Sequence, residues 1–164
     1  MTKLTDKLLA DDHRELDDLL RATFEALASN DDAAFERLDL FWARLAMHIR
    51  AEHLHLFPAL LKNAPDLPPH VPGMIEKLHD DHDFFMRELV AAVKRMRLIN
   101  AENSAAVRRE AADRLSAIEE RLKEHNRIEE NELYPLAASI DPNGGLAVPV
   151  KKELDNMPPR FREK

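Results

Sequence analysis

The stretch HIRAEHLHLFP, residues 48–58, places a histidine, a glutamate and two further histidines in the middle of a segment of helix-forming composition. The stretch HNRIEENELYP, residues 125–135, repeats its pattern. Each begins with His, has Glu four residues later, and ends with Leu, an aromatic residue and Pro. Residues four apart on a helix lie on the same face, one turn apart. Each stretch therefore directs one His and one Glu toward the same spot.

This spot lies on the face of each helix that should be packed inside the protein. Positions that step by three and four along a helix form a seam that faces a partner helix. Both seams are apolar for two turns and then become His followed by Glu. The seam positions are Leu38, Phe41, Leu45, His48, Glu52 and His55 in one helix, and Leu115, Ile118, Leu122, His125, Glu129 and Glu132 in the other.

The segments before these two helices repeat as well. Asp-Asp-His occurs at residues 11–13 and again at residues 80–82, each time on a helix whose later seam is apolar. The chain therefore reads as two copies of a helix pair. Each copy offers one His from its first helix, His13 or His82, and a His-Glu pair from its second.

Helix breakers and capping residues divide the chain into four long helices, expected over about 5–28, 32–62, 73–99 and 104–139. Short connections between them predict an all-α, antiparallel, up-down-up-down four-helix bundle. We expect one domain over residues 1–140, followed by a tail over residues 141–164. The tail contains prolines and basic residues, and one short helix is expected near residues 150–156, with a solvated end.

The composition limits the classes of function. A chain of 164 residues with a net charge of -7 has no run of Lys or Arg dense enough to bind a line of phosphates, which argues against a nucleic-acid partner. No stretch of eighteen apolar residues predicts a membrane span, and we expect a soluble, cytoplasmic protein. The sequence identifies no protein partner. Because there is no cysteine, any metal must be bound by His and carboxylates.

The repeated residues predict a dinuclear metal site. Burying isolated carboxylates costs several kcal/mol each unless they are paired or coordinate a metal. Glu52 and Glu129 would bridge two cations. The histidines would divide between the two cations, with His13 and His48 on one side and His82 and His125 on the other. The competing interpretation, histidines that only form hydrogen bonds in the core, suits a lone His better than a duplicated His-xxx-Glu motif.

On these residues the sequence resembles the hemerythrin-like, HHE cation-binding family over about residues 5–139. The resemblance implies a four-helix fold and two iron ions held by non-haem ligands. It also implies that His13, His48, Glu52, His82, His125 and Glu129 are the ligands.

The chain departs from the hemerythrins proper at two helices. They have His-xxx-His on the third helix and His-xxxx-Asp on the fourth, whereas here His79 and His82 are three residues apart and Glu129 lies four residues after His125. His79 either completes the shell of one metal or is a solvated histidine at the rim, and the sequence favours neither.

Four further polar residues near the motifs have less defined expectations. Related sequences often carry a second Glu where this chain has His53, and the other copy of this chain has Glu130 at the same position. We expect His53 to face the flank of its helix. His55 and Glu132, one turn beyond the carboxylates, are expected to orient a ligand. His70, in the proline-rich loop, is expected to be exposed.

An open position on each metal would bind dioxygen, peroxide or nitric oxide, which indicates oxygen handling or a stress response. Nitrogen and oxygen ligands also suit zinc or manganese, and it is the resemblance that favours iron. Apart from the ligands no residue is an evident general acid or nucleophile, so whether the protein is an enzyme stays open. One alternative function is an iron- or redox-sensing binding module without turnover. Another is a purely structural bundle in which histidines and acids pair with each other.

Overall fold

The computed structural model describes residues 4–161, and over these residues the chain forms helices and turns without a β-strand. This confirms the all-α class. The α-helices are α1 (Thr5–Ala28), α2 (Ala34–Ala51), α3 (Phe57–Lys62), α4 (Val71–Arg97), α5 (Ser104–Ile128), α6 (Tyr134–Ile140) and α7 (Ala147–Asp155). Short 3₁₀ turns, η2 (Ala64–Asp66) and η4 (Pro159–Phe161), follow α3 and α7.

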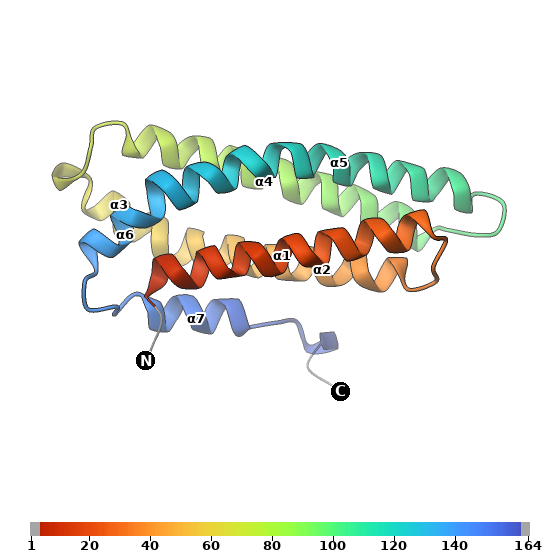
Figure 1. Cartoon of the computed structure of the whole chain (residues 1–164), viewed down its shortest axis with the longest axis horizontal. Coiled ribbons are helices and arrows are strands. Elements are labelled where there is room, and N and C mark those ends of the chain that lie inside the picture. Colours follow the sequence, from red (N-terminus) through yellow and green to blue (C-terminus); the bar gives the residue numbers. More distant parts are fainter. Residues whose placement is uncertain (1–3, 162–164) are drawn as a thin grey trace.

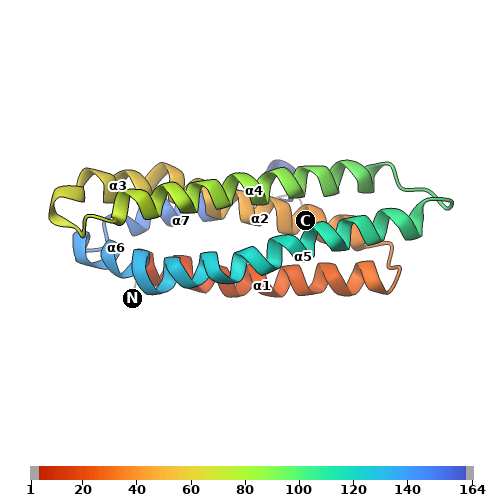
Figure 2. The same ribbon diagram turned by 90° about the horizontal axis from the view of Figure 1, so that it is seen from above.

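The four long helices α1, α2, α4 and α5 run along the long axis of the molecule (Figures 1 and 2). α1 contacts α2 and α5, and α4 contacts α2 and α5, so the four form a closed ring around a shared interior. α3 and α6 lie together at one end, opposite the loops that join α1 to α2 and α4 to α5. This arrangement brings one side of each long helix to the same interior.

Two apolar cores fill that interior, with a polar layer between them. Apolar residues recur every three or four positions along each helix, which buries one face. The core toward the α1–α2 and α4–α5 loops includes Phe41, Leu45, Phe85, Leu89, Leu115 and Ile118. The core at the end with α3 and α6 includes Leu9, Leu56, Leu60, Leu78, Leu133 and Tyr134. Between these cores lie the buried histidines and glutamates of the two motifs.

The second and fourth predicted helices are not continuous. Each contains a wider π-helical turn, η1 (Glu52–Leu56) between α2 and α3, and η3 (Glu129–Leu133) between α5 and α6. In these turns the backbone N–H of Phe57 donates to the carbonyl of Glu52, and that of Tyr134 donates to the carbonyl of Glu129. The following residue is proline in both cases and lacks an N–H, so regular α bonding cannot continue across it. Such turns occur frequently at functional sites.

The tail carries α7, which packs along α2 and α1 (Figure 1). α7 spans 147–155, slightly earlier than the short helix expected near 150–156. Its Val150 is fully buried in the second core. After α7, the guanidinium of Arg160 binds both oxygens of Asp39 on α2, at 2.9 and 2.7 Å. This contact ties residues near the end of the chain back to the bundle.

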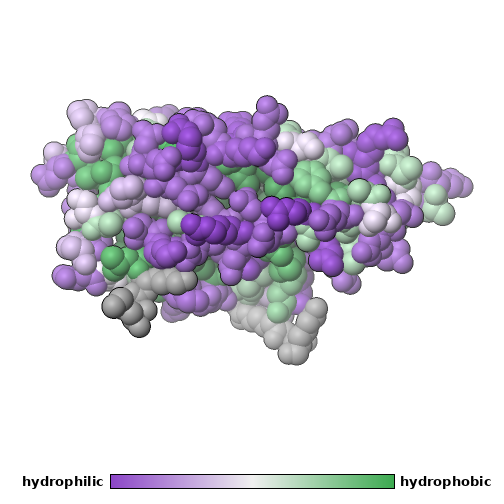
Figure 3. Space-filling model, viewed as in Figure 1, coloured by the Kyte–Doolittle hydropathy of each residue, from purple (hydrophilic) through white to green (hydrophobic). Residues whose placement is uncertain are grey.

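The surface is largely hydrophilic on the face shown in Figure 3, with smaller apolar areas between the charged side chains. Within residues 4–161, none of the helices has the length and apolar character needed to cross a bilayer.

Candidate metal centre

The polar layer brings six of the seven predicted ligands together. His13 lies on α1, His82 on α4, and each of the other two helices contributes a His and, at the first position of its π turn, a Glu. All six are buried: His13, His48, Glu52, His82, His125 and Glu129. Their side-chain nitrogen and oxygen atoms form two groups compact enough to hold a metal ion, with Glu129 common to both.

The four histidines form two pairs. His13 and His48 make up the first half of the centre, with ring centroids 4.8 Å apart. His82 and His125 make up the second half, also with centroids 4.8 Å apart. In the second half the two Nε2 atoms face each other at 3.1 Å. Each half therefore takes one His from the first helix of a copy and one from the second helix of the same copy.

The two carboxylates lie between the halves. Glu52 places Oε2 3.6 Å from Nε2 of His48 and Oε1 3.0 Å from Nε2 of His82. Glu129 Oε1 lies 3.1 Å from Nε2 of His13 and 3.2 Å from Nε2 of His125. Each carboxylate thus reaches one histidine of each half, which is the arrangement that a bridging ligand requires.

Every one of the four histidines has an outer partner at Nδ1. Asp12 Oδ2 lies 2.8 Å from His48, and Asp81 Oδ2 lies 3.0 Å from His125. The other two contacts cross between the copies, from Glu130 to His13 at 2.9 Å and from His53 to His82 at 2.8 Å. A carboxylate accepts the Nδ1–H of the imidazole and leaves Nε2 with its lone pair facing the centre, as metal-bound histidines require.

An arginine anchors the outer aspartate in both copies. Arg44 and Arg121 each lie four residues before the histidine of their helix. Arg44 Nη2 donates to Oδ1 of Asp12, and Arg121 Nε donates to Oδ1 of Asp81, both at 2.7 Å. Burial alone would raise the pKa of Asp12, but its bonds to His48 and Arg44 outweigh burial and lower that pKa. The aspartate therefore stays ionised and holds the histidine in one orientation.

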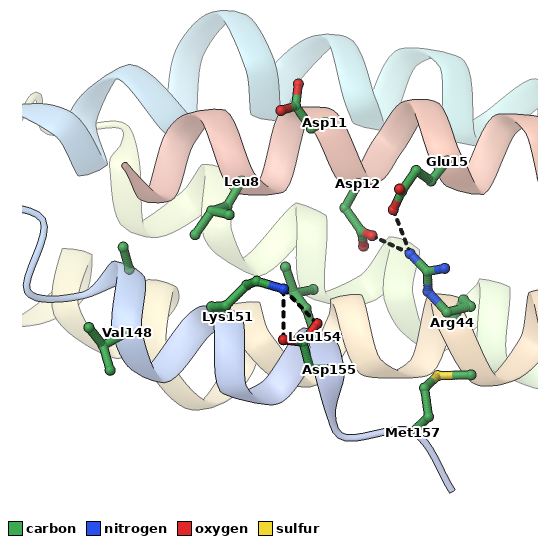
Figure 4. A pocket seen from close by; sticks show the side chains of 11 residues that line it. Leu8, Asp11, Asp12, Glu15, Arg44, Val148, Lys151, Leu154, Asp155 and Met157 are labelled. Carbon is green, nitrogen blue, oxygen red and sulfur yellow. Dashed lines mark hydrogen bonds and ion pairs between the residues drawn. The ribbon is translucent and has the colours of Figure 1, made fainter. Parts of the chain in front are cut away.

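The Asp12–Arg44 pair also borders a cavity of about 760 Å³ between α1, α2 and α7. Figure 4 shows the Asp12 carboxylate pointing toward Arg44, which contacts Glu15 as well. His48 does not line this cavity. The aspartate therefore uses one oxygen on the cavity side and the other on the buried histidine.

Tyr134 places its hydroxyl inside the first half. The hydroxyl donates to Glu52 Oε2 at 2.7 Å, and its oxygen lies 3.1 Å from Glu129 Oε1. It is also 3.1 Å from Nε2 of His13 and 3.3 Å from Nε2 of His48. Burial, together with the negative charges of the two glutamates, raises the pKa of Tyr134 well above its usual value. The equivalent residue in the other copy is Phe57, whose ring stacks on His82 at 5.8 Å.

The donor set fits a metal ion. Among the described residues, neither Glu52 Oε1 nor Glu129 Oε2 has a hydrogen-bond donor, although both atoms are buried. An unpaired buried carboxylate oxygen is costly, and a cation between the imidazole nitrogens and the carboxylates would offset that cost. Imidazole and carboxylate together suit iron, zinc or manganese.

Without a cation, protons compensate the same charges. Burial would lower the pKa of His125, but the charge of Glu129 and the bond to Asp81 raise it to about 9. The pKa of His48 is raised as well, since Glu52 and Asp12 outweigh its burial. A cation bound by these groups would have to displace the protons, which would make metal affinity depend on pH.

The structure does not bring His79 to the other six predicted ligands. The His79 side chain is 50% exposed, and its ring stacks on His53 at 4.4 Å. It belongs instead to a separate exposed group with Asp80 and Asp83.

The sequence led us to expect that His53 faces the flank of its helix, and the structure places it differently. It is half-buried and contacts a buried histidine, His82. Burial and the neighbouring rings of His82 and His79 lower the pKa of His53 to about 4.

Two residues expected to orient a ligand lie elsewhere. Nε2 of His55 approaches Glu153 on α7 at 3.6 Å, and Glu132 is exposed. His70 is exposed, as expected.

Sequence reasoning did not assign roles to five residues of the centre. They are Asp12, His53, Asp81, Glu130 and Tyr134. For the aspartates a signal was present in the sequence, because Asp-Asp-His repeats in both first helices and an Arg precedes the motif histidine by four residues in both second helices. Tyr134 was visible only as an aromatic residue before proline. The two contacts between copies had no signal, because they depend on how the copies face each other.

Comparison with known proteins agrees with this geometry. No match was found among the curated proteins or among the solved structures. The family model described as the hemerythrin HHE cation binding domain matches residues 4–137, which is most of the chain. The resemblance noted from the sequence is thereby confirmed, and the chain belongs to the hemerythrin HHE cation-binding domain family.

Proposed function

We propose that the protein is a non-haem di-iron protein, built as an up-down-up-down four-helix bundle, that binds or reacts with dioxygen, peroxide or nitric oxide. The observation that carries the proposal is the position of Glu52 and Glu129, each between a histidine of the first half and a histidine of the second. The ring of contacts among the four long helices supports the bundle. When bound, a pair of iron ions would supply redox chemistry and open positions for small molecules.

The six buried ligand candidates would hold the two ions. Glu52 and Glu129 would bridge them, while His13 and His48 hold one ion and His82 and His125 hold the other. Carboxylate bridges contributed by facing helices are a common way to build dinuclear sites in helical bundles.

Apolar residues around the centre would exclude water. Phe85 contacts the ring of His125 edge-on at 5.2 Å, and Phe57 stacks on His82. Phe41, Leu45, Ile118 and Leu122 are buried in the adjacent core. A dry surrounding strengthens electrostatic interactions and keeps competing water from a small ligand.

Tyr134 is the neutral hydroxyl group nearest to the candidate ligands. It can donate one hydrogen bond to Glu52 or Glu129, and its raised pKa keeps it protonated near neutral pH. We therefore assign Tyr134 the task of orienting the two carboxylates rather than acting as a nucleophile.

Metal content per chain tests the proposal. The protein is expressed with ample iron, purified without chelator and assayed by elemental analysis, followed by optical spectra under argon, in air and with nitric oxide. We expect two iron ions per chain and a spectrum that changes with these gases. The variant His125→Ala should lose iron, whereas His70→Ala, in an exposed loop position, should keep it. One ion per chain, zinc alone, or no metal would contradict the di-iron assignment.

A further inference from the structure

The two halves of the centre are related by the repeat, but their outer contacts are not equivalent. His13 and His82 are corresponding residues of the two copies, and so are Glu130 and His53. In the first half, Nδ1 of His13 contacts a carboxylate oxygen of Glu130 at 2.9 Å. In the second half, Nδ1 of His82 contacts Nε2 of His53 at 2.8 Å. Among the four histidines, His82 alone has another histidine as its outer partner.

The direction of this hydrogen bond follows from the surroundings of His82. Nε2 of His82 faces Glu52 Oε1 at 3.0 Å and Nε2 of His125 at 3.1 Å, so it must present a lone pair there to bind a cation. Its proton then lies on Nδ1 and is donated to Nε2 of His53. A histidine that accepts a bond at Nε2 carries its own proton on Nδ1 and is neutral.

Packing holds His53 in this position. Its ring stacks on His79 at 4.4 Å with an interplanar angle of 7°, and it contacts the ring of Phe57 at 5.4 Å. The orientation of His53 is therefore fixed by neighbours on α4 and α3. At the corresponding position Glu130 offers a carboxylate oxygen to His13, whereas His53 offers a ring nitrogen to His82.

The difference leaves the second half with less negative charge around its ligands. The histidines of the first half have two outer carboxylates, from Asp12 and Glu130. Those of the second half have one carboxylate, from Asp81, and the neutral His53. An outer carboxylate makes the imidazole a stronger ligand, and altering such a partner typically changes metal affinity by about 10- to 100-fold.

We propose that His53 makes the two metal positions unequal, so that the ion bound by His82 and His125 is held less tightly and leaves first. His53 is a positioning residue in this account, because it acts through His82. The inference rests on the proposed function, since it requires a centre that binds two cations. The metal position in the second half is then the one that exchanges its ion more readily.

Release of zinc tests the proposal, because zinc is redox-inert and its loss can be counted without interference from oxidation. Protein loaded with two zinc ions per chain is mixed with an excess of a coloured chelator, and the release of zinc is followed with time. We expect two phases of equal amplitude. His53→Glu, which restores the carboxylate of the other copy, should slow the fast phase by about 10- to 100-fold. A gain in retention cannot result from structural damage.

Three further variants complete the test. His53→Gln keeps a neutral acceptor and should release zinc as the parent protein does. Glu130→His should speed the slow phase, because it gives His13 of the first half a histidine as its outer partner, as His82 has in the second half. His70→Ala is the control, since His70 lies at an exposed loop position away from the centre, and both phases should keep their rates.

The outcomes separate this proposal from the one on which it depends. A protein that binds no zinc and no iron overturns both. A protein that binds two ions but releases them in one phase, with His53→Glu unchanged, keeps the dinuclear centre and overturns the role of His53. Should His53→Glu fail to fold, an unaltered slow phase in folded Glu130→His would likewise overturn the proposal.

Discussion

The first and second halves of the centre were built from the same pattern and differ only just outside the ligands. In both, an arginine holds an aspartate, the aspartate holds the histidine of the second helix, and both glutamates reach both halves. The differences include Glu130 against His53, Tyr134 against Phe57, and a bond from Lys77 to Asp81 that has no counterpart at Asp12 within residues 4–161. The comparison teaches that the repeat keeps the six candidate ligands and one aspartate–arginine pair in each half, whereas other neighbouring positions differ.

These differences give the two halves of the centre different surroundings. The first half is more polar, because the hydroxyl of Tyr134 lies among its ligands. The second half is more aromatic, with Phe57 and Phe85 against its histidines, and it leads outward through His53 to the exposed His79. A symmetric set of ligands can therefore serve two ions in different surroundings.

The largest loss of metal is expected when the carboxylate of Glu129, which both halves share, is removed. Glu129→Gln keeps the shape of the side chain but removes its charge, and Glu129 contacts histidines of both halves. We expect this variant to lose both iron ions, as measured by elemental analysis after reconstitution. Glu132→Gln, a matched change at an exposed position on the same π turn, should keep both. If Glu129→Gln retained one ion, the carboxylate would belong to one half only.

The pH dependence of stability should reverse between the metal-free and the loaded protein. In the metal-free protein, His125 has a pKa raised to about 9, against about 6.5 when unfolded. Its stabilising contribution is fully present below pH 6.5 and is lost as the pH rises through 9, with an upper limit of about 3 kcal/mol. In the loaded protein the histidines must be unprotonated, so stability should rise with pH and metal should leave as the pH falls through about 6 to 5.

Thermal unfolding between pH 5 and pH 9.5, with and without metal, measures both trends. The metal-free variant His125→Gln is the control and should show a smaller fall in stability above pH 6.5. A metal-free parent protein with a constant Tm from pH 6.5 to 9.5 would contradict the pairing of protonated His125 with Glu129 and Asp81.

A smaller change, in the free energy of unfolding, is expected when Tyr134 of the first half is replaced by phenylalanine, the residue that the second half has at Phe57. Tyr134→Phe removes a fully buried hydroxyl that donates to a buried carboxylate, which should lower the free energy of unfolding of the metal-free protein by about 2 kcal/mol. Thr23→Val removes another buried hydroxyl, but one bonded to the backbone carbonyl of Leu19, and should cost about 1 kcal/mol or less. Urea unfolding measures both changes. Equal losses would indicate that the hydroxyl of Tyr134 has no special role among the glutamates.

Much of the centre could be predicted from the sequence because its information is local. A His and a Glu four residues apart share a helix face wherever the helix packs, and duplication of the motif identified His48, Glu52, His125 and Glu129 together. The same periodicity predicted the long helices and their apolar seams. The π turns could not be predicted in this way, because a proline in a helix can also produce an end or a kink.

By itself the sequence determined the helices, the duplicated motif and the choice of nitrogen and oxygen ligands, since these follow from local periodicity and composition. Tertiary structure decided the rest. It separated His79 from the six buried residues, joined His13 to Glu130 across 117 positions, and turned His53 inward onto His82. The physical reason is that such contacts depend on how the two copies face each other, and helix periodicity carries no information about that arrangement.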